Sequence, residues 1–223
     1  MVRNIHYSGL KPMAKLSDLV AALAESTETP ETTVKEVARK LREGQLIRTG
    51  KGGRYGGAQM THDDVAALIV GLMAYRTSDS ALPKLAPLTR ELLRGTSYKS
   101  DREWRPGVWP RELNLPLLAK LKPGHSFKDA VVALILSVNR GDTEDIDSAE
   151  PVLQVVCASA RPFAVISFES GKKGPSITHI ELSYTSARSG FPIHTPRLSV
   201  TAQLMLATIK EIGGVIGSSS HAA

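Results

Sequence analysis

The sequence predicts an α+β fold, with helices in the first third of the chain and a small antiparallel sheet covered by helices in the last third. Three observations lead to this prediction. Apolar residues recur at helical spacing near the N-terminus, prolines and both tryptophans gather in the middle, and strand-like runs follow. We therefore expect a helical unit at residues 1–76, a structured connector at 77–124, an α+β unit at 125–216 and a disordered tail at 217–223.

Two amphipathic helices are expected at the start of the first unit. Pro12 suits a first helical turn, and an apolar stripe follows it at spacings of three and four. After the polar turn ESTETP, Thr29 is expected to cap a second helix, with Pro30 in its first turn, and Gly44 ends that helix. The inward stripes consist of Leu16, Leu19, Val20 and Leu23 in the first helix and of Val34, Val37, Ala38 and Leu41 in the second.

A basic, glycine-rich stretch, KGGRYGG at Lys51–Gly57, follows the second helix. It is not a P-loop, because Lys51 is followed by glycine rather than Ser or Thr, and GxGxxG fails because its last position is Tyr55. The flanking residues 46–47 and 58–60 are strand-like. We therefore interpret the stretch as the tip of a β-hairpin, whose glycines permit positive φ values.

A third helix is expected after this hairpin. Thr61 is placed to cap it, and the carboxylates of Asp63 and Asp64, next to His62, suit the positive end of the helix dipole. Its apolar stripe consists of Val65, Leu68, Ile69, Leu72 and Met73.

The remaining elements are shorter or β-rich. The predicted helices are Pro87–Arg94, Pro110–Leu121, Phe127–Val138 and a last one at about Ser199–Ile212. The predicted strands are Val152–Ser159, Phe163–Glu169 and Ser176–Ser186, joined as an antiparallel meander. In the third strand Ile180, Leu182 and Tyr184 alternate with polar residues, so one face of the sheet is expected to be buried.

The order of helix, short polar turn, helix and basic hairpin resembles the winged helix-turn-helix DNA-binding domain of transcriptional regulators. LSDLVAALAES matches the helix before the recognition helix, and TV, LREGQLI and the glycine-rich stretch match the recognition helix and wing, over about residues 12–75. The family has a further helix before these two; here it is either short or replaced by the helix after Thr61.

The resemblance implies a DNA-binding surface on the second helix and the hairpin. Short hydroxyls early in the helix and Lys or Arg further along suit a helix that enters the major groove, and the hairpin cations suit phosphate or the minor groove. The candidate residues are Thr32, Thr33, Lys35, Glu36, Arg39, Lys40, Arg48, Lys51, Arg54 and Tyr55. The alternative is that this helix face is only solvated. Tyr55 either packs on the hairpin or reaches a sugar or base.

Composition favours an anionic partner. Lys and Arg number 28 against 22 Asp and Glu in 223 residues, which gives a net charge of +6. The single cysteine, Cys157, excludes an internal disulfide, no apolar run reaches the ~20 residues of a membrane span, and the N-terminus lacks an apolar signal core. We expect a cytoplasmic protein with no membrane contact.

Signals for catalysis are weak. Cys157 lies among apolar residues of a predicted strand and reads as a core thiol, and the six histidines are dispersed with no HExxH or CxxC. The acidic run with Asp142, Glu144, Asp145 and Asp147 reads as a solvated loop rather than a cation site. The connector aromatics Trp104 and Trp109, interleaved with Lys and Arg, either stack on nucleic acid or hold neighbouring parts together. We expect no enzyme, no metal and no cofactor.

Taken together, the residues predict a sequence-specific DNA-binding transcriptional regulator, a repressor that binds double-stranded DNA as a homodimer. The last unit is expected to dimerise, or to hold a small-molecule or protein effector. The alternative is a replication, partition or architectural factor of a plasmid or phage, which would use the same DNA-binding unit and recruit partners through its last unit.

Overall fold

The computed structural model describes residues 14–49, 59–77, 82–97, 115–142, 149–158, 161–170, 179–185, 200–205, 208–212 and 214. Its helices are α1 Leu16–Ser26, α2 Glu31–Glu43, α3 His62–Thr77, the 3-10 turn η1 Leu82–Lys84, α4 Leu85–Arg94, α5 Pro116–Ala119 and α6 Phe127–Asn139. Its strands are β1 Thr96–Ser97, β2 Ala149–Ala158, β3 Arg161–Ser170, β4 His179–Thr185 and β5 Val200–Met205. Several predicted features lie outside these residues: the hairpin tip, the Trp104 and Trp109 stretch, most of the acidic loop and the tail.

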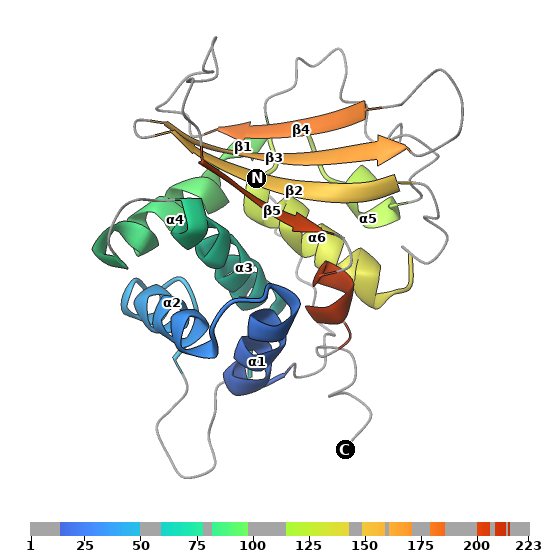
Figure 1. Cartoon of the computed structure of the whole chain (residues 1–223). Helices are drawn as coiled ribbons and strands as arrows, with labels where there is room; N and C mark the ends of the chain where they lie inside the picture. The colour runs from blue at the N-terminus through green and yellow to red at the C-terminus, as the bar shows by residue number, and fades with distance from the viewer. Residues whose placement is uncertain are drawn as a thin grey trace, which may run out of the picture.

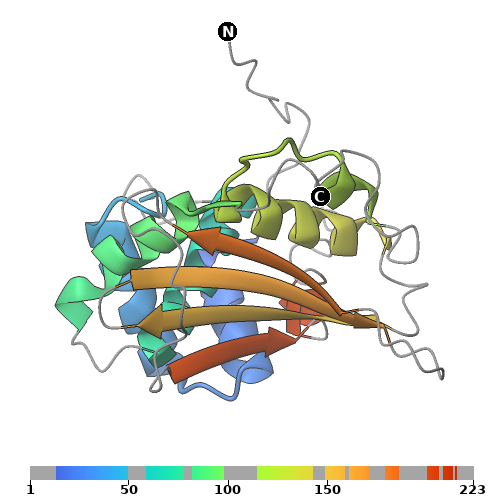
Figure 2. The same ribbon diagram turned by 90° about the horizontal axis from the view of Figure 1, so that it is seen from above.

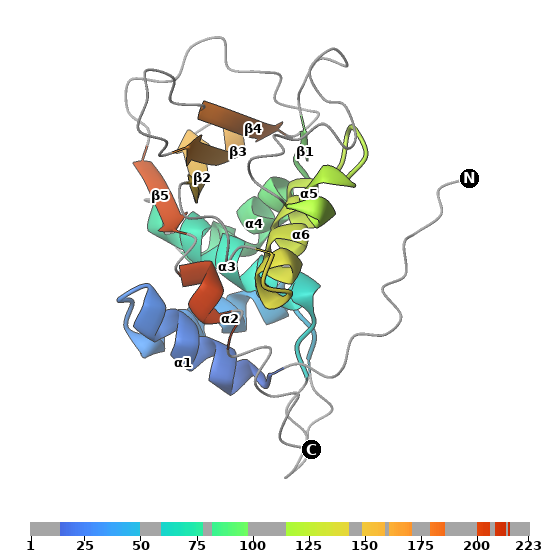
Figure 3. The ribbon, with the colours of Figure 1, turned by 90° about the vertical axis from the view of Figure 1, so that its right-hand side faces the viewer.

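The fold is rich in helix and arranged in layers. A five-stranded sheet forms one side, α3, α4 and α6 lie against it, and α1 and α2 lie on the far side of α3 (Figure 1, Figure 3). A helical turn at residues 208–212 returns the chain to α1, where the Thr208 hydroxyl donates to the Ser26 carbonyl at 3.5 Å. The helices that resemble a DNA-binding unit therefore belong to the same packed body as the sheet.

The sheet has the strand order β1-β4-β3-β2-β5, and every described pair is antiparallel. Strands β2, β3 and β4 coincide with the three predicted runs and follow one another along the chain, as a meander does, with the strands side by side over the helices (Figure 2). Ala164 of β3 stands opposite Tyr184 of β4, so their side chains share a face, and both are about 1% exposed. Ile166, two residues further along β3, is fully buried on the same face.

Residues 200–205 correct one prediction. The sequence predicted a helix over Ser199–Ile212, but Val200–Met205 form strand β5, which pairs with Val152–Cys157 of β2 residue for residue. Six consecutive backbone pairings with a neighbouring strand outweigh the helical spacing of a few apolar residues. The helical turn begins only at residue 208, and Ile209 and Ile212 are its buried residues.

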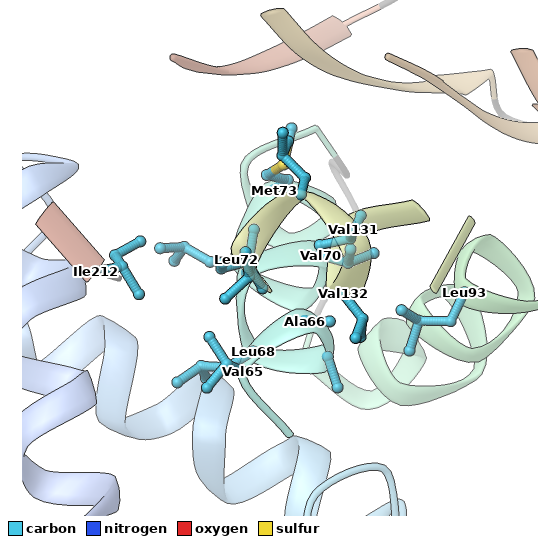
Figure 4. Packing of buried hydrophobic residues seen from close by; sticks show 14 of the residues in the cluster. Val65, Ala66, Leu68, Val70, Leu72, Met73, Leu93, Val131, Val132 and Ile212 are labelled. Atoms are coloured by element: carbon cyan, nitrogen blue, oxygen red, sulfur yellow. The ribbon is translucent and has the colours of Figure 1, made fainter. Parts of the chain in front are cut away.

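Helix α3 is the centre of the molecule. The five residues of its predicted stripe are buried, but so is every other residue from Asp64 to Ala74, so burial extends to all sides of the helix rather than to one stripe. It packs against α2, α4, α6, β2 and β5, and Figure 4 shows its side chains among those of α4, α6 and the last helical turn. A Cβ on Gly71 would lie 2.7 Å from Leu41 Cδ1, so glycine there lets α2 approach closely.

One hydrophobic cluster runs from Ala14 to Ile212 and includes residues of all three predicted units. The connector contributes Leu85, Leu92, Leu93, Leu115, Leu117 and Leu118 to it. The boundaries at residues 76 and 124 thus do not separate hydrophobic cores. Helix α4 begins two residues earlier than predicted, and α5 covers Pro116–Ala119 of the helix predicted over residues 110–121, of which residues 110–114 lie outside the described residues.

Candidate nucleic-acid interface

Helices α1 and α2 present the predicted faces. In α1 Leu19, Val20 and Leu23 are buried, and in α2 all four stripe residues are at most 1% exposed, which confirms the predicted stripes except for the half-buried Leu16. The opposite face of α2 carries the six candidate side chains. Thr32, Lys35 and Arg39 are exposed, and Thr33, Glu36 and Lys40 are half-buried.

The N-terminus of α2 differs from the prediction. Pro30 rather than Thr29 occupies the N-cap position, and no side chain caps the helix. The Thr29 hydroxyl instead accepts a hydrogen bond from the Thr27 hydroxyl at 2.9 Å and donates to the Thr27 carbonyl at 3.3 Å. Glu28, at φ 51°, turns the chain between the helices, and this turn directs Thr29 back toward α1, where it is 7% exposed.

Three cations of the α2 surface, Lys35, Arg39 and Lys40, are paired with carboxylates on the same helix. Lys35 Nζ lies 2.8 Å from Glu31 Oε1, and Lys40 Nζ lies 3.0 Å from Glu43 Oε2. Arg39 binds two carboxylates: Nε donates to Glu36 Oε2 at 2.8 Å, Nη2 to Glu36 Oε1 at 2.5 Å, and Nη1 to Glu43. The hydrogen bond with Glu36 raises the pKa of Arg39 and lowers the pKa of Glu36.

These pairs change how the predicted face is understood. The i,i+3 and i,i+4 spacings of these charges are visible in the sequence, but periodicity alone shows only that the residues face outward. The pairs lie at the surface and contribute little to stability. Their main consequence is that Lys35, Arg39 and Lys40 are already bound to carboxylates in the absence of a partner.

The C-terminus of α2 is locked onto α4. Gln45 takes a left-handed conformation at φ 57°, and Leu46 N donates to the Leu41 carbonyl at 2.9 Å, the pattern of a Schellman motif. A Cβ on Gly44 would lie 2.4 Å from Ala86 Cβ, and Arg90 of α4 donates to the Gly44 carbonyl. These contacts fix the position of α2 relative to α4, and with it the position of the exposed face of α2.

Asp64 organises the base of the predicted hairpin. Its Oδ1 accepts from the Arg48 backbone N at 2.9 Å, and its Oδ2 lies 2.9 Å from Arg48 Nε and 2.7 Å from both the backbone N and the hydroxyl of Thr61. Asp64 is 5% exposed, so its charge is held by these donors. One carboxylate thus joins the two ends of the segment between Arg48 and Thr61.

From the sequence, Asp64 is expected only to lie in the first turn of a helix, where its carboxylate suits the helix dipole. Thr61 and Asp64 have the spacing of a capping box, and the hydroxyl of Thr61 accepts from Asp64 N at 3.4 Å, as its predicted capping role requires. The second role of Asp64, toward Arg48, had no signal in the local sequence, because Arg48 lies 16 residues away.

The strand predicted to begin at Leu46 and Ile47 is wrong. Residues 46–49 form no ladder in the described chain, because the Arg48 N–H is taken by Asp64. Gln59 pairs instead with Lys15 before α1, and Met60 N donates to the Ala14 carbonyl at 3.2 Å. The candidates Lys51, Arg54 and Tyr55 lie outside the described residues, as does the side chain of Cys157.

A buried histidine–tyrosine pair links the sheet to the helices. His125 Nδ1 lies 2.9 Å from the Lys122 carbonyl, and Nε2 lies 2.9 Å from the Tyr184 hydroxyl. Because a carbonyl only accepts, Nδ1 carries the hydrogen and Nε2 accepts from the tyrosine. Burial lowers the pKa of His125 and raises that of Tyr184, which favours the neutral form of both groups and therefore this hydrogen bond.

A metal site requires several ligating side chains close together, and a membrane span requires a long apolar helix. Among the described residues no three His, Cys, Asp or Glu side chains gather to hold a metal ion, and no described helix has the length and apolarity to cross a membrane.

Comparison with known proteins adds no assignment. No family model, no curated protein and no solved structure matches this chain.

Proposed function

We propose that the protein is a cytoplasmic, DNA-binding transcriptional regulator that reads double-stranded DNA with α2, and that the segment after α2 acts as a wing. The observation that carries the proposal is the contrast between the two faces of α2. Its inner face is held by α3 and α4, while its outer face presents two hydroxyls and three cations to solvent. Major-groove readout needs a helix that is held firmly on one side and exposes polar side chains to solvent on the other.

Two further features support this proposal. Helix α3 packs on α2, and in our proposal it takes the place of the further helix that the winged helix-turn-helix family has before the two helices matched here by α1 and α2. Asp64 joins the ends of the glycine-rich segment, which suits a wing of defined position. We further propose that the protein represses as a homodimer, with the sheet side of the molecule available for a second copy or an effector.

Selection of duplexes from a random pool by the full-length protein tests DNA binding. We expect one enriched site with two related halves, and a non-specific affinity that falls as salt rises. The Lys51→Ala, Arg54→Ala double variant should flatten the slope of log K against log salt by about two units, one per phosphate. Absence of binding to any duplex at low salt would overturn the proposal.

Light scattering of the protein alone and with the selected duplex tests the homodimer. We expect a dimer on the two-halved site. A monomer in both conditions would remove the homodimer and leave a regulator that binds one half-site.

A further inference from the structure

Arg39 is the most heavily engaged cation in the described chain. Its guanidinium offers five N–H donors from three nitrogens, and each nitrogen donates to a carboxylate. Nε and Nη2 form a two-pronged contact with Glu36, and Nη1 reaches Glu43 on the next turn. The Arg39 side chain remains 50% exposed, so a ligand can approach it from solvent.

The same fork recognises three acceptors of similar shape. A carboxylate, a phosphate and the O6 and N7 atoms of guanine each accept two parallel hydrogen bonds from arginine. Glu36 occupies the fork formed by Nε and Nη2, and Glu43 engages Nη1, so both two-bond edges that a DNA group could use are already in contact with a carboxylate.

The two DNA acceptors are not equal competitors. A phosphate that displaces Glu36 brings a negative charge next to the released Glu36 and Glu43, so the exchange is opposed by repulsion. Guanine is neutral. The cytosine paired with it presents its N4 amino group in the same groove, and this group can donate to the released Glu36.

Resting on the proposed function, we propose that Glu36 and Glu43 form a latch on Arg39 that a G·C base pair opens and that the phosphate backbone does not. With the latch closed, Arg39 makes no contact with the backbone of non-specific DNA. At a site with a G·C pair under the middle of α2, Arg39 leaves the carboxylates and binds the guanine. Glu36 is then a specificity-determining residue: it rejects phosphate and, once released, contacts cytosine.

A matched control lies on the same helix. Glu31 pairs with Lys35 at 2.8 Å, and its side chain is 52% exposed, against 35% for Glu36 and 49% for Glu43. Glu31→Gln removes one negative charge from α2 and releases Lys35, and it leaves the contacts of Arg39 in place. Each change therefore releases one cation, and the latch is identified by whether the effect depends on Arg39.

The test is a double-mutant cycle in the full-length protein. Glu36→Gln and Glu31→Gln are each made alone and with Arg39→Ala, and binding to a random duplex pool is measured over a range of salt. We expect Glu36→Gln to strengthen this binding and to steepen the salt slope by about one unit relative to the wild type, because Arg39 becomes free for one phosphate. In the Arg39→Ala background Glu36→Gln should lose this effect, whereas Glu31→Gln, which releases Lys35, should act as it does alone.

A modified duplex tests the base contact. Replacing the guanine of the selected G·C pair by 7-deazaguanine, which lacks N7, should weaken the wild type roughly tenfold and leave Arg39→Ala unaffected. An effect of Glu36→Gln that is unchanged in the Arg39→Ala background would overturn the latch while DNA binding stands. A wild type that binds no duplex would overturn the proposed function, and the latch would fall with it.

Discussion

Helices α2 and α3 are neighbours in the chain and in the fold, and they differ in what they expose. Helix α2 buries one stripe and presents charged residues paired with one another on its other face. Helix α3 is buried from Asp64 to Ala74 and carries the packing of both the sheet and α2. Residues of α3 therefore mainly stabilise the fold, whereas the outer residues of α2 are exposed to solvent. Substitutions in α3 should lower stability, and substitutions on the outer face of α2 should change it little.

The largest effect is expected in the centre of α3. Leu68→Ala should lower the free energy of unfolding by about 2–5 kcal/mol, because Leu68 is 1% exposed and the surrounding helices leave a cavity when it is truncated. Urea denaturation followed by circular dichroism measures this change. A loss below about 1 kcal/mol would show that α3 is not the centre of the core.

Asp64 should come next, because it is buried and serves two segments. Asp64→Ala should cost about 2–3 kcal/mol, since it removes a helix cap and leaves the partly buried donors of Arg48 and Thr61 without this acceptor. Asp63→Ala is the matched control: Asp63 lies one residue away and makes a surface pair with Lys128 at 2.9 Å. That variant should lose less than about 1 kcal/mol in the same denaturation experiment.

The contact between the two helices gives a smaller effect. Alanine at Gly71 gains about 1 kcal/mol in helix propensity, but its Cβ would lie 2.7 Å from Leu41 Cδ1, and overpacking costs about 1–3 kcal/mol. Leu41 is fully buried and has no room to move aside, so we expect a net loss of about 1 kcal/mol. A more stable variant, by thermal unfolding, would mean that α2 and α3 are packed less closely.

Acid should weaken the core before it affects the α2 surface. Burial lowers the pKa of His62 and of His125 below the ordinary 6.5, so the unfolded chain binds more protons than the folded chain in that range. Stability should therefore fall as the pH drops below about 6.5. His125→Gln keeps a donor for the Lys122 carbonyl and an acceptor for the Tyr184 hydroxyl, so its stability should depend less steeply on pH. An unchanged slope would remove His125 from this effect.

The same contrast explains what the sequence could predict. The elements α1, α2 and α6 and the run of β2, β3 and β4 follow local periodicity, and their positions agree with the predicted ones within a few residues. Strand β5 and the burial of α3 depend on distant partners. Local spacing therefore predicted a helix where β5 forms, and it indicated only one of the buried sides of α3. In the candidate interface, the outer residues of α2 were identified from periodicity. The pairing of Arg39 and the double role of Asp64 arise from side-chain geometry that single residues do not reveal.

The smallest effect on stability is expected for Arg39→Ala. Arg39 is exposed and its ion pairs are screened by solvent, so the free energy of unfolding should change little. Binding should respond differently: loss of a two-bond contact to guanine should cost about 1–3 kcal/mol on the selected site and much less on random DNA. Denaturation and duplex titration on the same preparation separate three outcomes. Loss of specific binding with the fold intact supports readout by α2. Unchanged binding and stability would make this face only a solvated surface. A large loss of stability would mean that Arg39 packs inside the protein, against its 50% exposure.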